Sequence, residues 1–197
     1  GAKISENKNI FVFFGADTIS SRIQGYFQAM EDHHLKDDIK IYKEPSNRLK
    51  NASESITQYL KEHSRPPQAI IAPNDLGAIG IISTLKKRGW RVPEDCAVVG
   101  IDNIALAEYF DPPLTSIGFD NGYFARLVWE LLEKRLKKTE TGPAKNLKLH
   151  QEFIARRTAV DVERSQPERG IFFHRTHQIE SLIRNRFLSG ADDMLPF

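Results

Sequence analysis

The chain has 197 residues, 40% of them hydrophobic and 27% charged, and its formal net charge is +2. This composition is ordinary for a soluble globular protein, so it excludes a disordered chain, and no apolar run approaches the roughly 20 residues that a membrane span needs. A charge so close to neutral, without a long basic run, also argues against DNA binding by these residues alone.

The first half of the chain predicts alternating strands and helices. An apolar run at residues 9–15 (NIFVFFG) indicates a buried strand, and the alternating run 38–42 (DIKIY) indicates a second, short one. Residues 18–34 and 53–63 carry apolar side chains at spacings of three and four, which is typical of amphipathic helices. Strands that alternate with helices favour an α/β fold with a parallel sheet.

The stretch from Ala69 to Thr115 carries the strongest signal. Two short apolar runs, AII and CAVVGI, are each followed closely by polar side chains, with an amphipathic helix predicted over residues 76–88 between them. Runs that are apolar on both faces are typical of parallel strands covered by helices on both sides. Ligands bind at the carboxyl ends of such strands. We therefore expect three polar side chains to lie together at that edge: Asn74, Asp75 and Asp102.

Cys96 is the only cysteine, and it lies inside the second apolar run. A single cysteine excludes an internal disulfide and fits a reducing compartment, so we expect a cytoplasmic protein. Its position favours a buried, inert thiol over a nucleophile.

The last third of the chain predicts one strong helix and an amphipathic tail. The helix covers residues 121–138. A basic segment at 174–188 has an apolar face, for which we prefer packing on the chain's own surface to a partner or a linked module. The histidines form no complete ligand set, so we expect neither a metal nor a cofactor. The side chains expected to face inward from the helix are Phe124, Val128, Leu131, Leu132 and Leu136.

Four pieces of this sequence, taken together, resemble one family. AIIAPND, LGAIG, LKKRGWRVPEDCAVVGIDN and PPLTS, in this order and spacing, are similar to the effector-binding domain of the LacI/GalR transcription regulators. The resemblance implies an α/β fold with a parallel sheet flanked by helices, of the type I periplasmic-binding-protein-like class. It also implies that most of the N-terminal subdomain is missing from this chain.

The resemblance divides the chain into five parts. Residues 1–17 would hold the last strand of the N-terminal subdomain, and 18–117 the C-terminal, effector-binding subdomain. Residues 118–146 would cross back and form a helix returning to the N-terminal subdomain, and 147–160 would hold the final strand. Residues 161–197 lie beyond the resemblance, as a C-terminal extension with a helix.

The resemblance also implies a ligand site. Arg22, in SSRIQGYF, matches the arginine that reaches the effector, and Asp102 matches the effector-binding aspartate. Asn74 matches a ligand-contacting polar position, whereas Asp75 is expected to cap the helix beside it. The alternatives without ligand contact are a surface position for Arg22 and a capping role for Asp102.

Aromatic stacking on the ligand is expected from an unusual position. Many family members carry an aromatic side chain in the loop that corresponds to EPSNRLKNAS, but here Pro45, Arg48 and Leu49 occupy it. Phe119 stands where the family usually has Gln-Pro, so it is a candidate to supply the missing aromatic edge.

The family's dimer interface corresponds to the start of the helix at 76–88 and to the segment around Phe110. Ile79 and Phe110 are thus candidate dimer contacts. Ordinary core burial is an equally good alternative for both, because an apolar helix stripe is usually core.

These residues favour a sensor over two other classes of protein. The leading hypothesis is the effector-binding and dimerisation domain of a LacI-type regulator, with a sugar-like effector, a homodimer and DNA contacts made only by a head absent from this chain. The alternative is a solute-binding protein or the sensor domain of a transport or signalling system. An enzyme using Asp75 and Asp102 as an acid–base pair is not expected, because no nucleophile, phosphate loop or metal set accompanies them.

Overall fold

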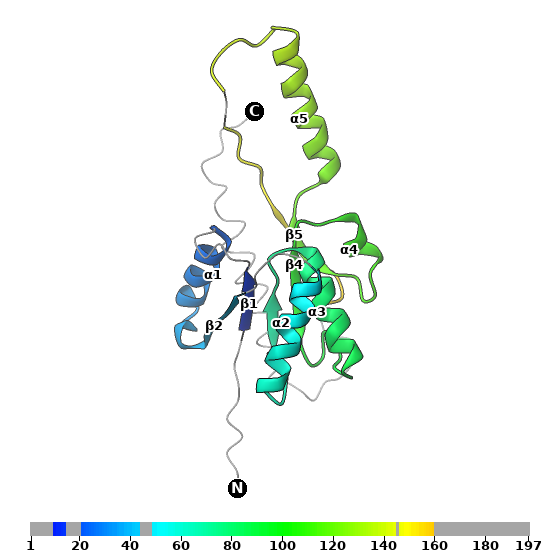
Figure 1. Ribbon diagram of the computed structural model, residues 1–197. Coiled ribbons are helices and arrows are strands. Elements are labelled where there is room, and N and C mark those ends of the chain that lie inside the picture. Colours follow the sequence, from blue (N-terminus) through cyan, green and yellow to red (C-terminus); the bar gives the residue numbers. More distant parts are fainter. Residues whose placement is uncertain (1–9, 15–20, 44–48, 145, 160–197) are drawn as a thin grey trace.

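The computed structural model describes residues 10–14, 21–43, 49–144 and 146–159. They form one six-stranded sheet with the order β2-β1-β3-β4-β5-β6, in which β1 to β5 run parallel and β6 is antiparallel to β5 (Figure 1). The strands are β1 (Ile10–Phe14), β2 (Ile39–Lys43), β3 (Ala69–Ile71), β4 (Ala97–Ile101), β5 (Thr115–Gly118) and β6 (Glu152–Ile154). The helices are α1 (Ser21–Asp32), the 3-10 helix η1 (Lys36–Asp38), α2 (Leu49–Glu62), α3 (Asp75–Lys87), α4 (Ala105–Tyr109) and α5 (Asn121–Leu136).

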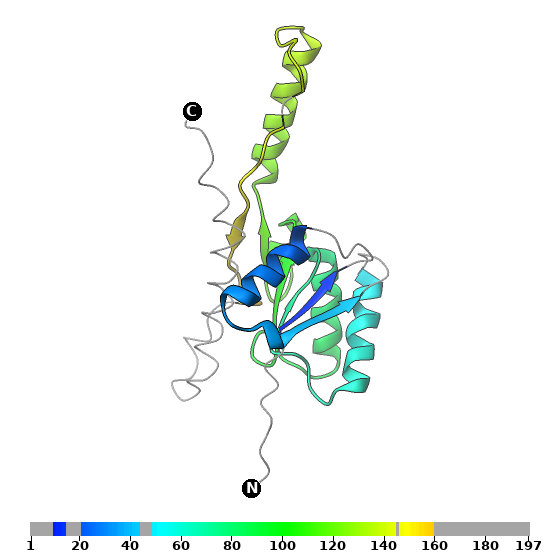
Figure 2. The same cartoon turned by 90° about the vertical axis from the view of Figure 1, so that its left-hand side faces the viewer.

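The predicted α/β architecture is confirmed, with a mixed rather than purely parallel sheet. Helix α1 covers one face of the sheet, and α2 and α3 cover the other (Figures 1 and 2). Three described elements were not predicted, namely the 3-10 helix η1, the short helix α4 and the strand β5. None of the described helices is long and apolar enough to cross a membrane.

One predicted domain boundary is wrong. We expected residues 1–17 to hold the last strand of an N-terminal subdomain, but β1 pairs with both β2 and β3 inside the six-stranded sheet. A buried parallel strand is apolar throughout in the sheet of either subdomain. The sequence alone therefore could not tell to which of the two sheets β1 belongs. The tail at 161–197, with its predicted helix, lies outside the described residues.

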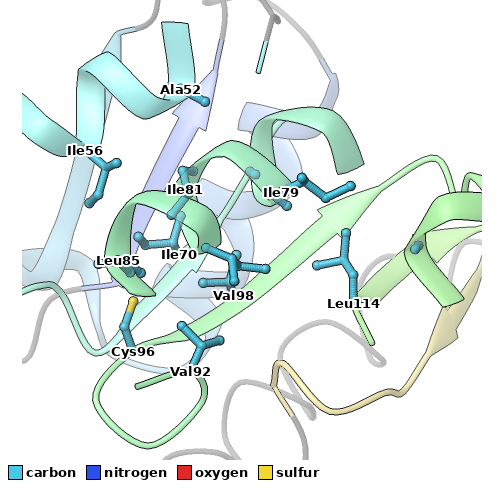
Figure 3. Close-up of a cluster of buried hydrophobic side chains, with 14 of the residues drawn as sticks. Ala52, Ile56, Ile70, Ile79, Ile81, Leu85, Val92, Cys96, Val98 and Leu114 are labelled. Atoms are coloured by element: carbon cyan, nitrogen blue, oxygen red, sulfur yellow. The ribbon is translucent and has the colours of Figure 1, made fainter. Parts of the chain in front are cut away.

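Side chains on the central strands alternate between two cores. Ile70 and Val98 point toward α2 and α3, in the cluster that Figure 3 shows, and both are fully buried. Their neighbours Ile71 and Val99 point to the opposite face and pack against α1. This period of two explains why each run is apolar throughout, because both faces of each strand are covered. Cys96 is buried in the first cluster, as expected for an inert thiol.

Helices α2 and α3 approach each other closely at Gly80. The hydroxyl of Ser53 donates to the carbonyl oxygens of Leu49, at 3.0 Å, and of Gly80, at 3.1 Å. A Cβ atom at Gly80 would overlap the Leu49 carbonyl group. The glycine inside the predicted LGAIG helix therefore permits a helix–helix contact.

Helix α5 departs from the expectation most clearly. It projects away from the sheet (Figures 1 and 2), and none of its residues is buried. Its predicted inward face is therefore open in this chain: Phe124, Val128, Leu132 and Leu136 are exposed, and Leu131 is half-buried. Tyr123 and Trp129, which were not predicted to face inward, are also exposed.

We expect Gly80→Ala to lower the free energy of unfolding by about 1–3 kcal/mol, because the added methyl group meets backbone rather than a movable side chain. This loss should exceed the gain of roughly 0.5–1 kcal/mol that alanine brings to a helix interior. Urea unfolding followed by circular dichroism measures it. Gly142→Ala is the control, since a Cβ there meets no atom within 4 Å. An equally stable Gly80→Ala protein would contradict the close contact.

Candidate functional site

Arg22 and Asp102 meet at the carboxyl edge of the sheet. Arg22 lies in the first turn of α1, and Asp102 directly follows β4. The Arg22 Nη2 atom is 3.5 Å from Asp102 Oδ1, and Nη1 donates to the Pro73 carbonyl oxygen at 2.8 Å. Both side chains remain partly open to solvent, with 40% of Arg22 and 45% of Asp102 exposed. The structure thus brings together two of the predicted ligand residues, 80 positions apart in the printed sequence.

The carboxylate of Asp102 is poised to accept hydrogen bonds. Partial burial raises the pKa of Asp102 above its usual range, and the nearby Arg22 guanidinium opposes that rise. Because the ion pair is long and half exposed, the two groups hold each other only weakly. Both side chains therefore have hydrogen-bonding capacity left for a bound molecule.

Asn74 begins helix α3 beside this pair. Its side-chain oxygen accepts a hydrogen bond from the Gly77 N–H at 2.7 Å, which makes Asn74 the N-cap of the helix. The expectation that Asp75 would be the cap is therefore wrong. The predicted ligand role of Asn74 stays a prediction, and its amide is held at the edge by the cap.

Asp75 lies beneath the edge with no exposed surface. One carboxylate oxygen accepts from the Ser116 hydroxyl at 2.6 Å, and the other accepts from the Ile104 N–H at 2.8 Å. Burial raises the pKa of Asp75, and these two hydrogen bonds oppose the rise. The sequence carried one signal for such a buried carboxylate, because Gly100 in β4 leaves the space that it occupies.

A second layer of contacts joins the edge to β6. Arg156 donates to the Asn103 side-chain oxygen at 2.9 Å and to the Leu114 carbonyl oxygen at 2.8 Å. Asn121, at the start of α5, donates to the Asn103 carbonyl oxygen at 3.1 Å. Asn103 ends the LKKRGWRVPEDCAVVGIDN piece of the resemblance but was given no role there, and sequence reasoning did not single out Asn121.

Phe119 follows β5, which runs parallel to β4, so it leaves the sheet at the same edge. Its ring packs against Phe124 with centroids 5.0 Å apart, and its side chain is half-buried. The predicted contact with a ligand remains a prediction. Pro45 and Arg48, in the loop without an aromatic, lie outside the described residues, whereas Leu49 is exposed at the start of α2.

The two candidate dimer residues lie mainly in the core of the chain. Ile79 is 5% exposed and belongs to the cluster in Figure 3, and Phe110 packs against that cluster while partly exposed. Ile79 thus fits the core alternative, and its role in a dimer stays a prediction. The exposed apolar side chains nearest to them along the chain are Leu76, Leu106 and Tyr109.

The described residues hold no group of three histidine, cysteine, aspartate or glutamate side chains that could bind a metal ion. Asp75 and Asp102 do lie close enough for the charge on Asp102 to raise the pKa of Asp75. Yet Asp75 has no exposed surface and both its oxygens accept hydrogen bonds from the protein. This geometry suits a structural carboxylate better than an acid or base that must reach a substrate.

Comparison with known proteins finds one matching family model and relatives of similar sequence. The model of the periplasmic binding protein-like domain matches residues 6–159. The chain is 33% identical over 137 residues to the HTH-type transcriptional repressor PurR of Vibrio atlanticus (strain LGP32), covering 70% of this chain and 40% of that protein. The chain thus spans less than half the length of this curated relative.

Two solved structures have the same fold. A LacI family transcriptional regulator from Arthrobacter sp. FB24, in complex with lactose, matches with a TM-score of 0.68 and 26% identity over 77% of this chain and 56% of its own. The transcriptional regulator CelR, in complex with cellobiose, matches with a TM-score of 0.62 and 25% identity over 77% of this chain and 46% of its own.

The raised pKa of Asp75 predicts a pH dependence. A group whose pKa is raised on folding stabilises the protein below its ordinary value, 3.8 here, and loses that contribution as pH rises through the folded-state pKa. Asparagine does not titrate, so the stability of Asp75→Asn relative to the parent should increase from about pH 4 toward pH 7.

Denaturant unfolding of both proteins across this pH range measures the difference. The comparison is made in an Asp102→Asn background, because the charge on Asp102 also raises the pKa of Asp75. A difference that stays constant or runs the other way would contradict the burial of an ionisable carboxyl group.

Proposed function

The chain belongs to the periplasmic binding protein-like domain family, among the LacI-type transcription regulators, and from this we propose that it is the part of such a regulator that binds the effector and dimerises. The effector is a sugar or a related small molecule, and no chemical change of the effector is needed. Such a regulator acts in the cytoplasm, where its DNA is.

The pairing of Arg22 with Asp102 at the carboxyl edge carries this proposal. A carboxylate accepts two hydroxyl groups at once, and a guanidinium presents a rigid fork of donors, so the pair suits a molecule with neighbouring hydroxyl groups. Asn74 adds an amide and Phe119 an aromatic edge at the same side of the sheet. The lactose and cellobiose bound to two regulators of the same fold support this chemical class.

The regulatory mechanism follows from differential binding. An effector held between two subdomains stabilises the closed arrangement, and only a molecule that binds the closed form more tightly can shift the balance. Closure changes the relative position of the two subunits of a homodimer. DNA is contacted by a head that is not part of the 197 residues, which fits their near-neutral charge.

Exposed apolar side chains on α3 and α4 support the homodimer. Leu76, Leu106 and Tyr109 are 45%, 49% and 79% exposed. Leu76 lies near the predicted contact Ile79 along the chain, and Leu106 and Tyr109 lie near the predicted contact Phe110. A homodimer would remove this apolar surface from water. Ile79 is itself buried, so it would support the interface from within rather than contact the partner.

The alternative, a solute-binding protein or the sensor domain of a transport or signalling system, shares the fold. It is less well supported, because the relative reported above is a repressor and both matched complexes are transcriptional regulators.

We expect lactose and cellobiose to bind the 197-residue chain with affinity no tighter than about 1 mM, and Arg22→Ala to abolish this binding. The chain covers 56% of the lactose-bound regulator, so it supplies only part of the contacts. Sugar-dependent chemical-shift changes in ¹⁵N-labelled protein, titrated to high sugar concentration, measure weak affinities of this kind. The wider screen includes sugar acids and nucleobases.

Arg91→Ala is the matched control. Arg91 forms an ion pair with Asp95 at 2.8 Å, at the amino end of β4 and therefore at the opposite edge of the sheet. It should leave sugar-dependent shifts unchanged. A ligand whose binding survives Arg22→Ala and Asp102→Asn would disprove this placement of the site.

A further inference from the structure

Two consecutive residues at the proposed site have left-handed backbone conformations. Asp102 has a φ of 112° and Asn103 a φ of 50°, a region that side-chain-bearing residues seldom adopt. Such conformations persist only where surrounding contacts impose them. The direction of the Asp102 carboxylate therefore depends on whatever holds this turn.

The N–H groups of the turn are held by the sheet below it. The Asp102 N–H donates to the Ile117 carbonyl oxygen at 2.8 Å, which continues the β4–β5 ladder by one residue. The Asn103 N–H donates to the Ser116 hydroxyl oxygen at 3.0 Å. Ser116 in turn donates to Asp75, so the second N–H is linked to the buried carboxylate through one hydroxyl group.

The third N–H, that of Ile104, donates directly to the other Asp75 oxygen at 2.8 Å. One carboxylate thus fixes two successive amides of the turn, directly and through Ser116. It also stands at the first position of α3, immediately after Asn74. Through Asp75, the start of α3 and the turn after β4 are joined as one unit.

Two glycines leave space for the contacts that link Asp75 to the turn after β4. A Cβ atom at Gly100 would overlap the Asp75 carboxylate, and one at Gly118 would lie 2.6 Å from the Asn103 Cβ. Neither glycine has a φ in the left-handed range, so both are required by close approach rather than by backbone conformation.

We propose that Asp75 is a positioning residue for the ligand site: it holds the Asp102–Asn103 turn in its left-handed conformation and so aims the Asp102 carboxylate at Arg22. Asp75 contacts no ligand, and its effect on binding passes through Asp102. Binding of a ligand at this edge rests on the proposed function, whereas the effect of Asp75 on the turn does not.

Three variants separate positioning from general stability. Asp75→Ala removes both acceptors. Asp75→Asn is the conservative rescue, since its amide oxygen can accept from Ile104 while its amide nitrogen donates to Ser116. Thr158→Val is the matched control, because the buried Thr158 hydroxyl likewise makes two bonds between strands, accepting from Thr115 at 2.8 Å and donating to Val98 at 2.6 Å.

The scalar couplings between HN and Hα of Asp102 and Asn103, with their ¹³Cα shifts, report the two φ angles in labelled protein. We expect Asp75→Ala to lose the left-handed signature at both residues, Asp75→Asn to keep it, and Thr158→Val to keep it despite comparable destabilisation in urea. An Asp75→Ala protein that retains both left-handed signatures would overturn the proposal, and so would their loss in Thr158→Val.

The couplings need no ligand, so this result is independent of the proposed function. If the site does not bind sugars, the parent chain shows no shift with lactose or cellobiose, yet the couplings still answer whether Asp75 sets the turn. Where the parent binds, we expect Asp75→Ala to weaken binding by about tenfold or more and Thr158→Val to leave it unchanged.

Discussion

The parallel register of β3, β4 and β5 is the constraint on which the site depends. Ile71 pairs with Val99, and Ile101 pairs with Ile117, so the carboxyl ends of these strands lie at one edge. Residues that follow the strands are thereby gathered there, whatever their separation in sequence. Arg22 reaches the same edge from α1, which covers the face of the sheet opposite to α2 and α3.

Burial of Asp75 is the energetic counterpart of this arrangement. A carboxylate without exposed surface is costly unless hydrogen bonds satisfy it, and here a hydroxyl group and a backbone amide do so. Isosteric apolar replacement would remove the desolvation cost but would also release the turn that carries Asp102. In our interpretation, burial of the Asp75 carboxyl group lowers stability but gives the Asp102 side chain a defined direction.

The fold and the meeting of Arg22 with Asp102 could be predicted from the sequence, but their supporting contacts could not. Apolar runs such as AII and AVVGI reveal buried strands because both their faces are covered. The sequence analysis assigned the helix cap to Asp75 instead of Asn74, because either side chain can cap a helix and only tertiary contacts decide between them. Likewise, nothing in the sequence announces that Asn103 and Arg156 meet across 53 residues.

Helix α5 shows what an amphipathic pattern does and does not establish. Its apolar stripe predicts a buried face, yet Val128, Leu132 and Leu136 are 46%, 48% and 69% exposed in this chain. The helical spacing of apolar residues predicts that one face of the helix is buried, but it does not predict which segment buries that face. The helix forms with its own N-cap, in which Asp120 accepts from the Tyr123 N–H at 2.9 Å, so local signals suffice for the helix itself. The match covers 56% of the lactose-bound regulator, so 44% of that chain lies outside the matched region. An exposed stripe therefore agrees with a helix that packs against a second subdomain, which remains a prediction for residues 118–146.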